Sequence, residues 1–139
     1  MIHRVDFSKP VWRYLYQPLY QRVLDYALAH AETEQTIISK FILLLASDLS
    51  THLLVEVDSS GEVLSHCLIN VLKTSEVTRT VIIEQLHVIK SSTFIQECLE
   101  YAQTLEPTRT LLVSDQKSFR PLAKKYKLEV SKVVLEVTK

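Results

Sequence analysis

The segment TVIIEQLHVIKSSTFIQECLEYAQTL, residues 80–105, is the stretch on which the fold of this chain depends. Its first part, Val81–Ile89, is rich in β-branched and apolar residues, which is typical of a strand inside a sheet. The polar tripeptide SST, residues 91–93, can cap a helix, and Gln96 follows its threonine at the spacing of a capping box. Apolar residues then recur at helical spacing up to Leu105. A strand that enters a helix through a polar turn can hold an anion such as phosphate.

The size and composition of the chain predict one globular domain, residues 1–139. Hydrophobic residues make up 47% and charged residues 23% of the sequence, which is an ordinary balance. Lys plus Arg and Asp plus Glu both number 16, so the formal net charge is zero. This balance argues against nucleic acid as a partner, and a low net charge eases association with other proteins.

The cysteines and the N-terminus indicate a soluble intracellular protein. Cys67 and Cys98 lie in half-apolar stretches, so we expect buried free thiols in a reducing compartment rather than a disulfide. The first residues are too polar for a signal peptide. The longest apolar run, Phe41–Ala46, is too short to cross a bilayer, so we predict no membrane partner.

Gly61 is the only glycine in the chain. Loops that wrap phosphate closely need several glycines, because side chains block the approach of the backbone. Walker and Rossmann loops are therefore excluded. Gly61 lies in the turn DSSGE, residues 58–62, where a hairpin requires one residue with positive φ.

The remaining elements follow from periodicity and turn residues. Pro18 lies inside the helical stretch 11–31, so we expect a short helical turn and then a main helix that starts near the proline. The pattern predicts strands at 2–7, 53–57, 63–72, 80–89, 108–113 and 128–137, and further helices at 35–47, 94–105 and 119–127. The three strands from 53 to 89 form an antiparallel meander. This order predicts an α+β fold.

Three local patterns accompany this order: LLVEV at 53–57 followed by GEV at 61–63, LHV at 86–88, and the closing helix and strand at 119–130. Together they resemble the GNAT superfamily of acyl-CoA-dependent N-acetyltransferases over nearly the whole chain. The resemblance implies a GNAT-like mixed central sheet of about six strands with helices on both faces.

A narrower resemblance is to the short GNAT-like proteins of tailed bacteriophages. It lies in VWRYL at 11–15 with Pro18 and Leu19, in the helix at 37–45, and in the ending VVLEV at 133–137. It implies a protein of the host cytoplasm or of the phage particle.

The resemblance also implies where an acyl-CoA site would lie. The backbone of Leu86 to Val88 would hydrogen-bond the pantetheine arm, and the turn Lys90, Ser91, Ser92 and Thr93 would meet the pyrophosphate. Glu84 would remove the proton from the amine.

The chain departs from the family pattern at this site. No glycine occurs from Ile89 to Phe94, and side chains there would crowd a pyrophosphate. If the family's closing helix and strand fall on Ala123 to Leu128, Ala123 and Lys127 stand where the family has a tyrosine and a glycine, and we expect Tyr126 to point elsewhere on the helix. We therefore expect a degenerate site with no cofactor, or acetyl-CoA if the protein is an enzyme.

Each candidate residue has a structural alternative. Glu84 would instead pair with a lysine or face solvent, and residues 91–93 would only cap the helix. His87 would lie on the opposite face of the strand from Leu86 and Val88. His52 and His66 could approach each other across the first hairpin, but no Cys or His pair has ligand spacing, so we predict no metal site.

The aromatic residues Trp12, Tyr14, Tyr16 and Tyr20 are too dense for one helix face to bury. We predict that part of this cluster contacts other protein subunits, because aromatic residues are enriched in binding hot spots. The favoured function is therefore a non-catalytic interaction or structural protein, such as a phage virion or assembly component. The alternatives are an N-acetyltransferase with an atypical pyrophosphate loop and a protein that modulates a host target.

Overall fold

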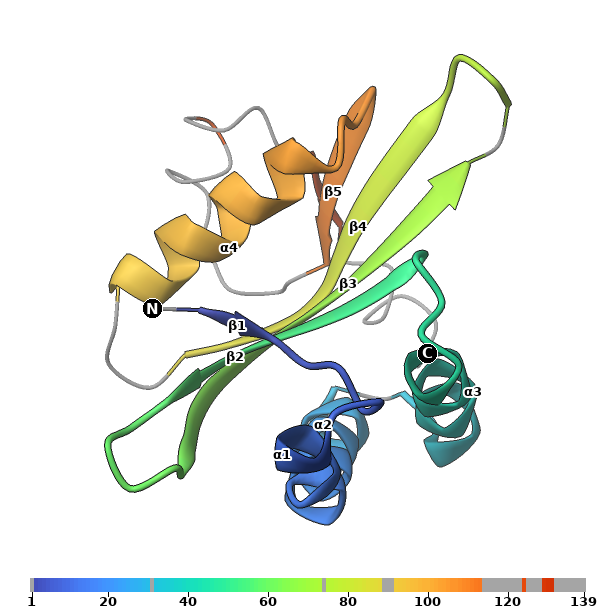
Figure 1. Ribbon diagram of the computed structural model, residues 1–139. Coiled ribbons are helices and arrows are strands. Elements are labelled where there is room, and N and C mark those ends of the chain that lie inside the picture. The colour runs from blue at the N-terminus through green and yellow to red at the C-terminus, as the bar shows by residue number, and fades with distance from the viewer. Residues whose placement is uncertain are drawn as a thin grey trace.

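A six-stranded sheet in the order β1-β2-β3-β4-β5-β6 forms the centre of the structure, a computed structural model (Figure 1). The structure describes residues 2–30, 32–73, 75–88, 92–113, 124 and 129–131. The strands are β1 (His3–Arg4), β2 (Thr51–Val57), β3 (Val63–Lys73), β4 (Arg79–His87), β5 (Arg109–Val113) and β6 (Glu129–Ser131). The helices are α1 (Pro10–Arg13), α2 (Tyr16–Ala29), α3 (Glu34–Leu45) and α4 (Ser92–Thr104).

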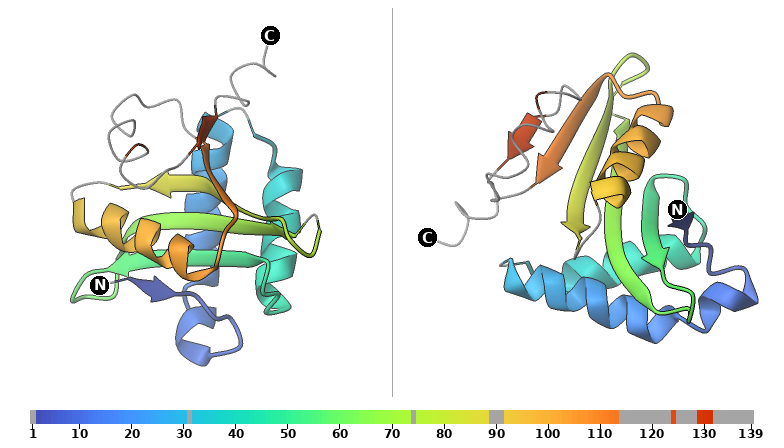
Figure 2. Two further views of the ribbon diagram at one scale, coloured as in Figure 1. Left: turned by 90° about the horizontal axis from the view of Figure 1, so that it is seen from above. Right: turned by 90° about the vertical axis from the view of Figure 1, so that its left-hand side faces the viewer.

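The sheet is mixed. Strands β1 to β4 pair antiparallel with their sequence neighbours, and β4, β5 and β6 run parallel. The parallel step from β4 to β5 passes through α4, which lies on one face of the sheet, while α2 and α3 cover the other face (Figure 2). The predicted α+β architecture, with about six strands and helices on both faces, is confirmed. None of the described helices is long and apolar enough to cross a bilayer.

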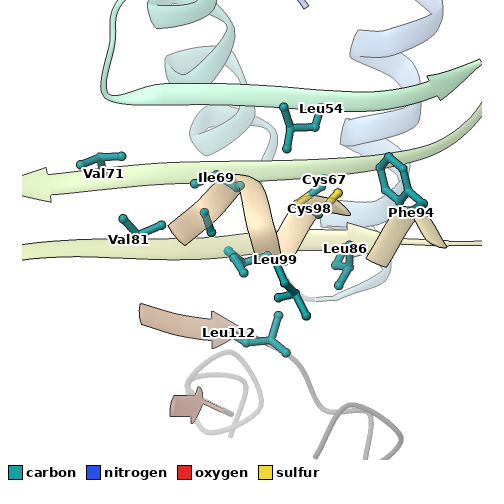
Figure 3. Close-up of a cluster of buried hydrophobic side chains, with 12 residues drawn as sticks. Leu54, Cys67, Ile69, Val71, Val81, Leu86, Phe94, Cys98, Leu99 and Leu112 are labelled. Carbon is teal, nitrogen blue, oxygen red and sulfur yellow. The ribbon is translucent and has the colours of Figure 1, made fainter. Parts of the chain in front are cut away.

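Two apolar clusters hold the layers together. One lies between the sheet and α4 and includes Phe94, Leu99 and both cysteines (Figure 3). Cys67 and Cys98 are buried free thiols, as expected, and hydrogen bonding to Cys67 together with burial raises the pKa of Cys98. The other cluster joins α2 and α3 to the sheet around Phe41 and Leu53.

The start of α2 follows the prediction from Pro18. Helix α1 ends at Arg13 and α2 begins at Tyr16, so the proline lies in the first turn, where a missing N–H costs nothing. Leu19, Val23 and Ala27 recur every four residues along α2 and are fully buried against the sheet.

The β2–β3 hairpin also has its predicted form. Gly61 adopts φ +86°, and its N–H donates to the Asp58 carbonyl at 3.0 Å. The Asp58 carboxylate accepts from the hydroxyl of Ser60 and from the backbone N–H groups of Ser60 and Glu62, which holds the turn and lowers the pKa of Asp58.

The capping box predicted at Thr93 is wrong. Helix α4 already begins at Ser92, so Thr93 is a helical residue and cannot cap the helix. Gln96 instead donates to Glu100 one turn later, at 3.1 Å. The position before the helix is Ser91, which lies outside the described residues.

Several predictions fall outside the described part of the chain. They concern Ile89, Lys90, Ser91, the side chain of Ser92, and Ala123, Tyr126 and Lys127. The helix predicted at 119–127 is described only at Lys124, and the strand predicted at 128–137 only as β6.

Candidate functional site

A β-bulge at Glu84 interrupts β4. Leu68 of β3 pairs with Gln85 and the next residue, Ile69, pairs with Ile83, so Glu84 is the extra residue. A bulge changes which face the following side chains occupy. Ile83 and Leu86 therefore pack in the cluster beneath α4.

Gln85, by contrast, lies on the α2 face of β4. Its side-chain Nε2 donates to the Val23 carbonyl of α2 at 3.3 Å. Glu84 bonds to α3, as described below, and His87 borders a pocket of α2. The polar side chains of β4 at positions 84, 85 and 87 thus face α2 and α3, whereas that of Leu86 faces α4.

The described pairing of β4 with β5 begins at Thr80 with Arg109. Their last described pair is Ile83 with Leu112, whereas β4 runs on to His87. Beyond the bulge, the described part of β5 does not pair with the backbone of β4.

Arg22 of α2 ties the helix to the ends of β3 and β4. Its Nη2 donates to the Leu64 carbonyl at 2.6 Å and its Nη1 to the Val63 carbonyl at 3.3 Å. Its Nε donates to Nδ1 of His66 at 3.1 Å. Nη2 also lies 3.1 Å from Nδ1 of His87. These four acceptors, two carbonyl oxygens and two imidazole nitrogens, are neutral, and burial lowers the pKa of Arg22.

His66 is fully buried, and its protonation follows from its partners. A guanidinium only donates, so Nδ1 of His66 accepts and Nε2 carries the proton. Nε2 then donates to Oε1 of Gln85 at 2.7 Å. Burial lowers the pKa of His66 to about 3. His66 is therefore a neutral structural residue whose two nitrogens are both used.

A pocket of about 760 Å³ opens between α2 and the end of β4. Arg22, Asp25, Tyr26 and His30 of the α2 segment line it together with His87. The rings of His30 and His87 both lie against Tyr26, with centroid distances of 4.1 and 5.8 Å. Burial, and then Arg22 and His30, lower the pKa of His87.

Glu84 pairs with Lys40 of α3. Oε1 of Glu84 lies 3.0 Å from Nζ of Lys40, and the two side chains are only 19% and 15% exposed. The structural alternative of a lysine partner is therefore confirmed. Glu32 lies in the same region, where burial and the charge of Glu84 raise its pKa.

The other predicted site residues separate onto the two faces. His87 lies on the opposite face from Leu86, as predicted, and Val88 packs at the edge of the α4 cluster. The expected approach of His52 and His66 is wrong, because β2 presents His52 to α4. There His52 bonds the Tyr101 hydroxyl at 2.8 Å. No group of three metal-ligating side chains occurs within the described residues.

Sequence reasoning missed Arg22, Tyr26, His30 and Gln85 as site residues. The one available signal was Arg22 itself, a cation one residue from the buried side chain of Val23. The bulge had no sequence signal that we can identify, because no glycine or proline marks it.

The aromatic cluster is divided between interior and surface. Tyr16 and Tyr20 pack edge-on against Phe41, with centroid distances of 5.7 and 5.1 Å. Trp12 is half-buried, whereas the side chain of Tyr14 is 88% exposed. Tyr14 is thus the member of the cluster with a large free surface.

No protein-family model matches the chain, and no curated protein matches it. Solved structures do. A probable acetyltransferase superposes with a TM-score of 0.62 and 12% identity, over 91% of this chain and 85% of that one. The chain has a GNAT-like fold. Glucosamine-6-phosphate N-acetyltransferase from Arabidopsis thaliana gives a TM-score of 0.57 and 11% identity, over 95% and 92% of the two chains.

A third similar structure is the ribosomal-protein-alanine N-acetyltransferase from Brucella melitensis biovar Abortus 2308. Its TM-score is 0.56 at 12% identity, over 90% of this chain and 89% of that one. At such identities the likeness establishes the fold alone. The narrower resemblance to phage proteins stays a prediction.

Proposed function

We propose that the protein is an acyl-CoA-dependent N-acyltransferase with an atypical pyrophosphate loop. The observation that carries the proposal is the pocket between α2 and the end of β4, beside the bulge at Glu84. The similarity to acetyltransferase structures supports this function over the non-catalytic role favoured by the sequence.

The pantetheine arm and the diphosphate of an acyl-CoA would contact different parts of the protein. The backbone of Leu86 to Val88 remains the predicted partner of the extended, amide-bearing pantetheine arm. The diphosphate would meet the N-terminus of α4, whose 13 residues give a helix dipole with its positive end at Ser92. Lys90, Ser91 and Thr93 remain the predicted partners there. The bound thioester would supply an activated acyl group.

The pocket on the α2 face suits the amine that receives the acyl group. Asp25 lies on its wall, and a carboxylate attracts an ammonium group. The side-chain amide of Gln21 donates to Oδ1 of Asp25 at 2.7 Å, which holds that carboxylate in place. Glu84, the base predicted from the sequence, pairs with Lys40 of α3 through one of its oxygens.

Titration calorimetry with acetyl-CoA tests the proposal. A ligand that binds only the folded state raises its stability by about 2.7 kcal/mol at one hundred times its Kd, so thermal unfolding with acetyl-CoA provides a second readout. Loss of thioester absorbance with added amines then measures transfer. A flat titration at millimolar acetyl-CoA, with no thermal stabilisation, would refute the proposal.

Tyr14 supports a second candidate, the interaction role. Its side chain, which directly follows α1, and that of Val11 in α1 are 88% and 63% exposed. We propose that this surface contacts another protein subunit. Sedimentation of the 16.0 kDa chain and of its Tyr14→Ala variant tests self-association. A monomer at all concentrations in both proteins would count against a second copy as the partner. The phage particle remains a sequence-based prediction.

A further inference from the structure

The two histidines of the α2 pocket have opposite tautomers. His30 follows the last residue of α2, and its Nδ1 lies 2.8 Å from the Tyr26 carbonyl. A carbonyl only accepts, so Nδ1 carries the proton and neutral His30 keeps a lone pair on Nε2. Tyr26 also stacks on the imidazole, with an interplanar angle of 15°, and both contacts hold its orientation.

His87 has the reverse arrangement. Its Nδ1 lies 3.1 Å from Nη2 of Arg22, which can only donate, so Nδ1 accepts and the ring proton is on Nε2. Among the described residues, Nε2 of neither histidine has a hydrogen-bond partner. The pocket therefore offers one imidazole acceptor and one imidazole donor to the same ligand.

We propose that His30 is the proton acceptor and His87 the positioning donor for an amine substrate of one class. Such a substrate carries an oxygen on the carbon beside the one that bears its amino group. The proposal rests on the proposed acyltransferase function. Asp25 on the pocket wall attracts the ammonium form, Nε2 of His30 accepts a proton from its nitrogen, and Nε2–H of His87 donates to the neighbouring hydroxyl, ether or carbonyl oxygen.

The transfer step balances with these residues. The ammonium first loses one proton to Nε2 of His30, which passes it to solvent. The free amine then attacks the thioester carbonyl carbon, the N–C bond forms, and the C–S bond breaks with its electron pair going to sulfur. The second proton lost by the nitrogen also goes to Nε2 of His30. His30 then releases that proton to solvent, and the thiolate takes up one proton from solvent, so the products are the amide and the free thiol.

Asparagine variants separate the role of Nε2 in each histidine from the structural hydrogen bond made by Nδ1. The side-chain amide of asparagine reaches about as far as Nδ1 of histidine, so His30→Asn retains a donor to the Tyr26 carbonyl but removes Nε2. In the same way, His87→Asn retains an acceptor for Arg22 and removes the Nε2 proton. His3→Asn is the matched control, because His3 is exposed on β1.

The substrates form a matched pair as well. 2-Aminoethanol and propylamine have the same number of heavy atoms and differ by a hydroxyl in place of a methyl group. Rates are compared at equal concentrations of free base and with acetyl-CoA as donor. We expect the wild-type kcat/KM for 2-aminoethanol to exceed that for propylamine by about tenfold or more, since one hydrogen bond contributes about 1.4 kcal/mol.

The two histidine variants should change different kinetic properties. His30→Asn should lower kcat about a hundredfold or more for both amines, as expected for loss of a general base, and added imidazole should restore part of the rate in His30→Ala. His87→Asn should abolish the preference for 2-aminoethanol. Unchanged kcat in His30→Asn, or an unchanged preference in His87→Asn, overturns the proposal.

Nitrogen-15 NMR of the histidine rings gives a readout that does not need activity. We expect Nδ1–H for His30 and Nε2–H for His87 and His66 at neutral pH, each assigned from its variant. The opposite tautomer at His30 or His87 overturns the proposal. Wild-type protein that binds acetyl-CoA but acetylates neither amine also overturns the proposal. Wild-type protein that does not bind acetyl-CoA refutes the proposed function instead, and the tautomers then test the two imidazoles by themselves.

Discussion

The buried imidazole of His66 should make the protein sensitive to acid. The pKa of His66 is about 3 in the folded protein, against about 6.5 in an unfolded chain. Because the folded pKa is depressed, the unfolded state takes up the proton first as the pH falls. The stability that neutral His66 contributes is thus complete above about pH 6.5 and is lost as the pH falls toward 3.

The size of this loss follows from linkage. At pH 5 an unfolded histidine is almost fully protonated, whereas His66 in the folded protein is not. The pH then lies about 1.5 units below the unfolded pKa, so the free energy of unfolding falls by about 2 kcal/mol at 1.36 kcal/mol per unit. Protonation would require Nδ1 of His66 to donate, but that atom faces the guanidinium of Arg22 at 3.1 Å. The structure thus explains why the imidazole resists the charge.

Urea unfolding at pH 7.5 and at pH 5.0 measures the effect. Wild type and His66→Gln are compared, because glutamine retains a donor toward Gln85 and does not titrate. His52 and His87, whose pKa values are also lowered, contribute equally to both proteins. Wild type should lose about 2 kcal/mol more than the variant, with His3→Gln as the exposed control. Equal losses in wild type and His66→Gln would refute the reasoning.

Three further predictions concern the loop, the ion pair and the turn. S-Acetylpantetheine should bind within about tenfold of acetyl-CoA, because a loop without glycine adds little affinity for the diphosphate; a much larger ratio in calorimetry would show that the loop binds it well. Lys40→Met should lower the free energy of unfolding at pH 7 by about 1–3 kcal/mol, since it leaves the half-buried Glu84 without its partner, and adding Glu84→Gln should recover part of the loss in urea titrations. Gly61→Val should cost about 1–2 kcal/mol, because φ is +86° there, whereas Gly61→Asn should cost less; equal midpoints for the two variants would contradict the turn assignment.

Local signals in the sequence predicted much of the fold. The position of Pro18 placed the start of α2, Gly61 marked the hairpin turn, and the apolar repeat after Phe94 identified α4. Each of these features depends on residues within a turn or two of one another, where dihedral preferences and side-chain spacing act directly. The antiparallel meander and its two-faced core follow from the same alternation.

The candidate site was not predictable in this way, except for Glu84 and the face of His87. Arg22 reaches its acceptors across 41 to 65 residues of sequence, so no local pattern identifies them. The alternation along β4 would have placed Gln85 with Ile83 under α4. The bulge at Glu84 reversed that, and a bulge exists only in relation to the paired strand β3.

The sequence alone therefore determined the order of the elements, the turns and the apolar faces, because these arise from neighbouring residues. Only the tertiary structure decided which polar side chains meet. Strand register and helix packing brought Arg22, His30 and His87 around one pocket, and the partners of each imidazole then set its tautomer and its chemistry.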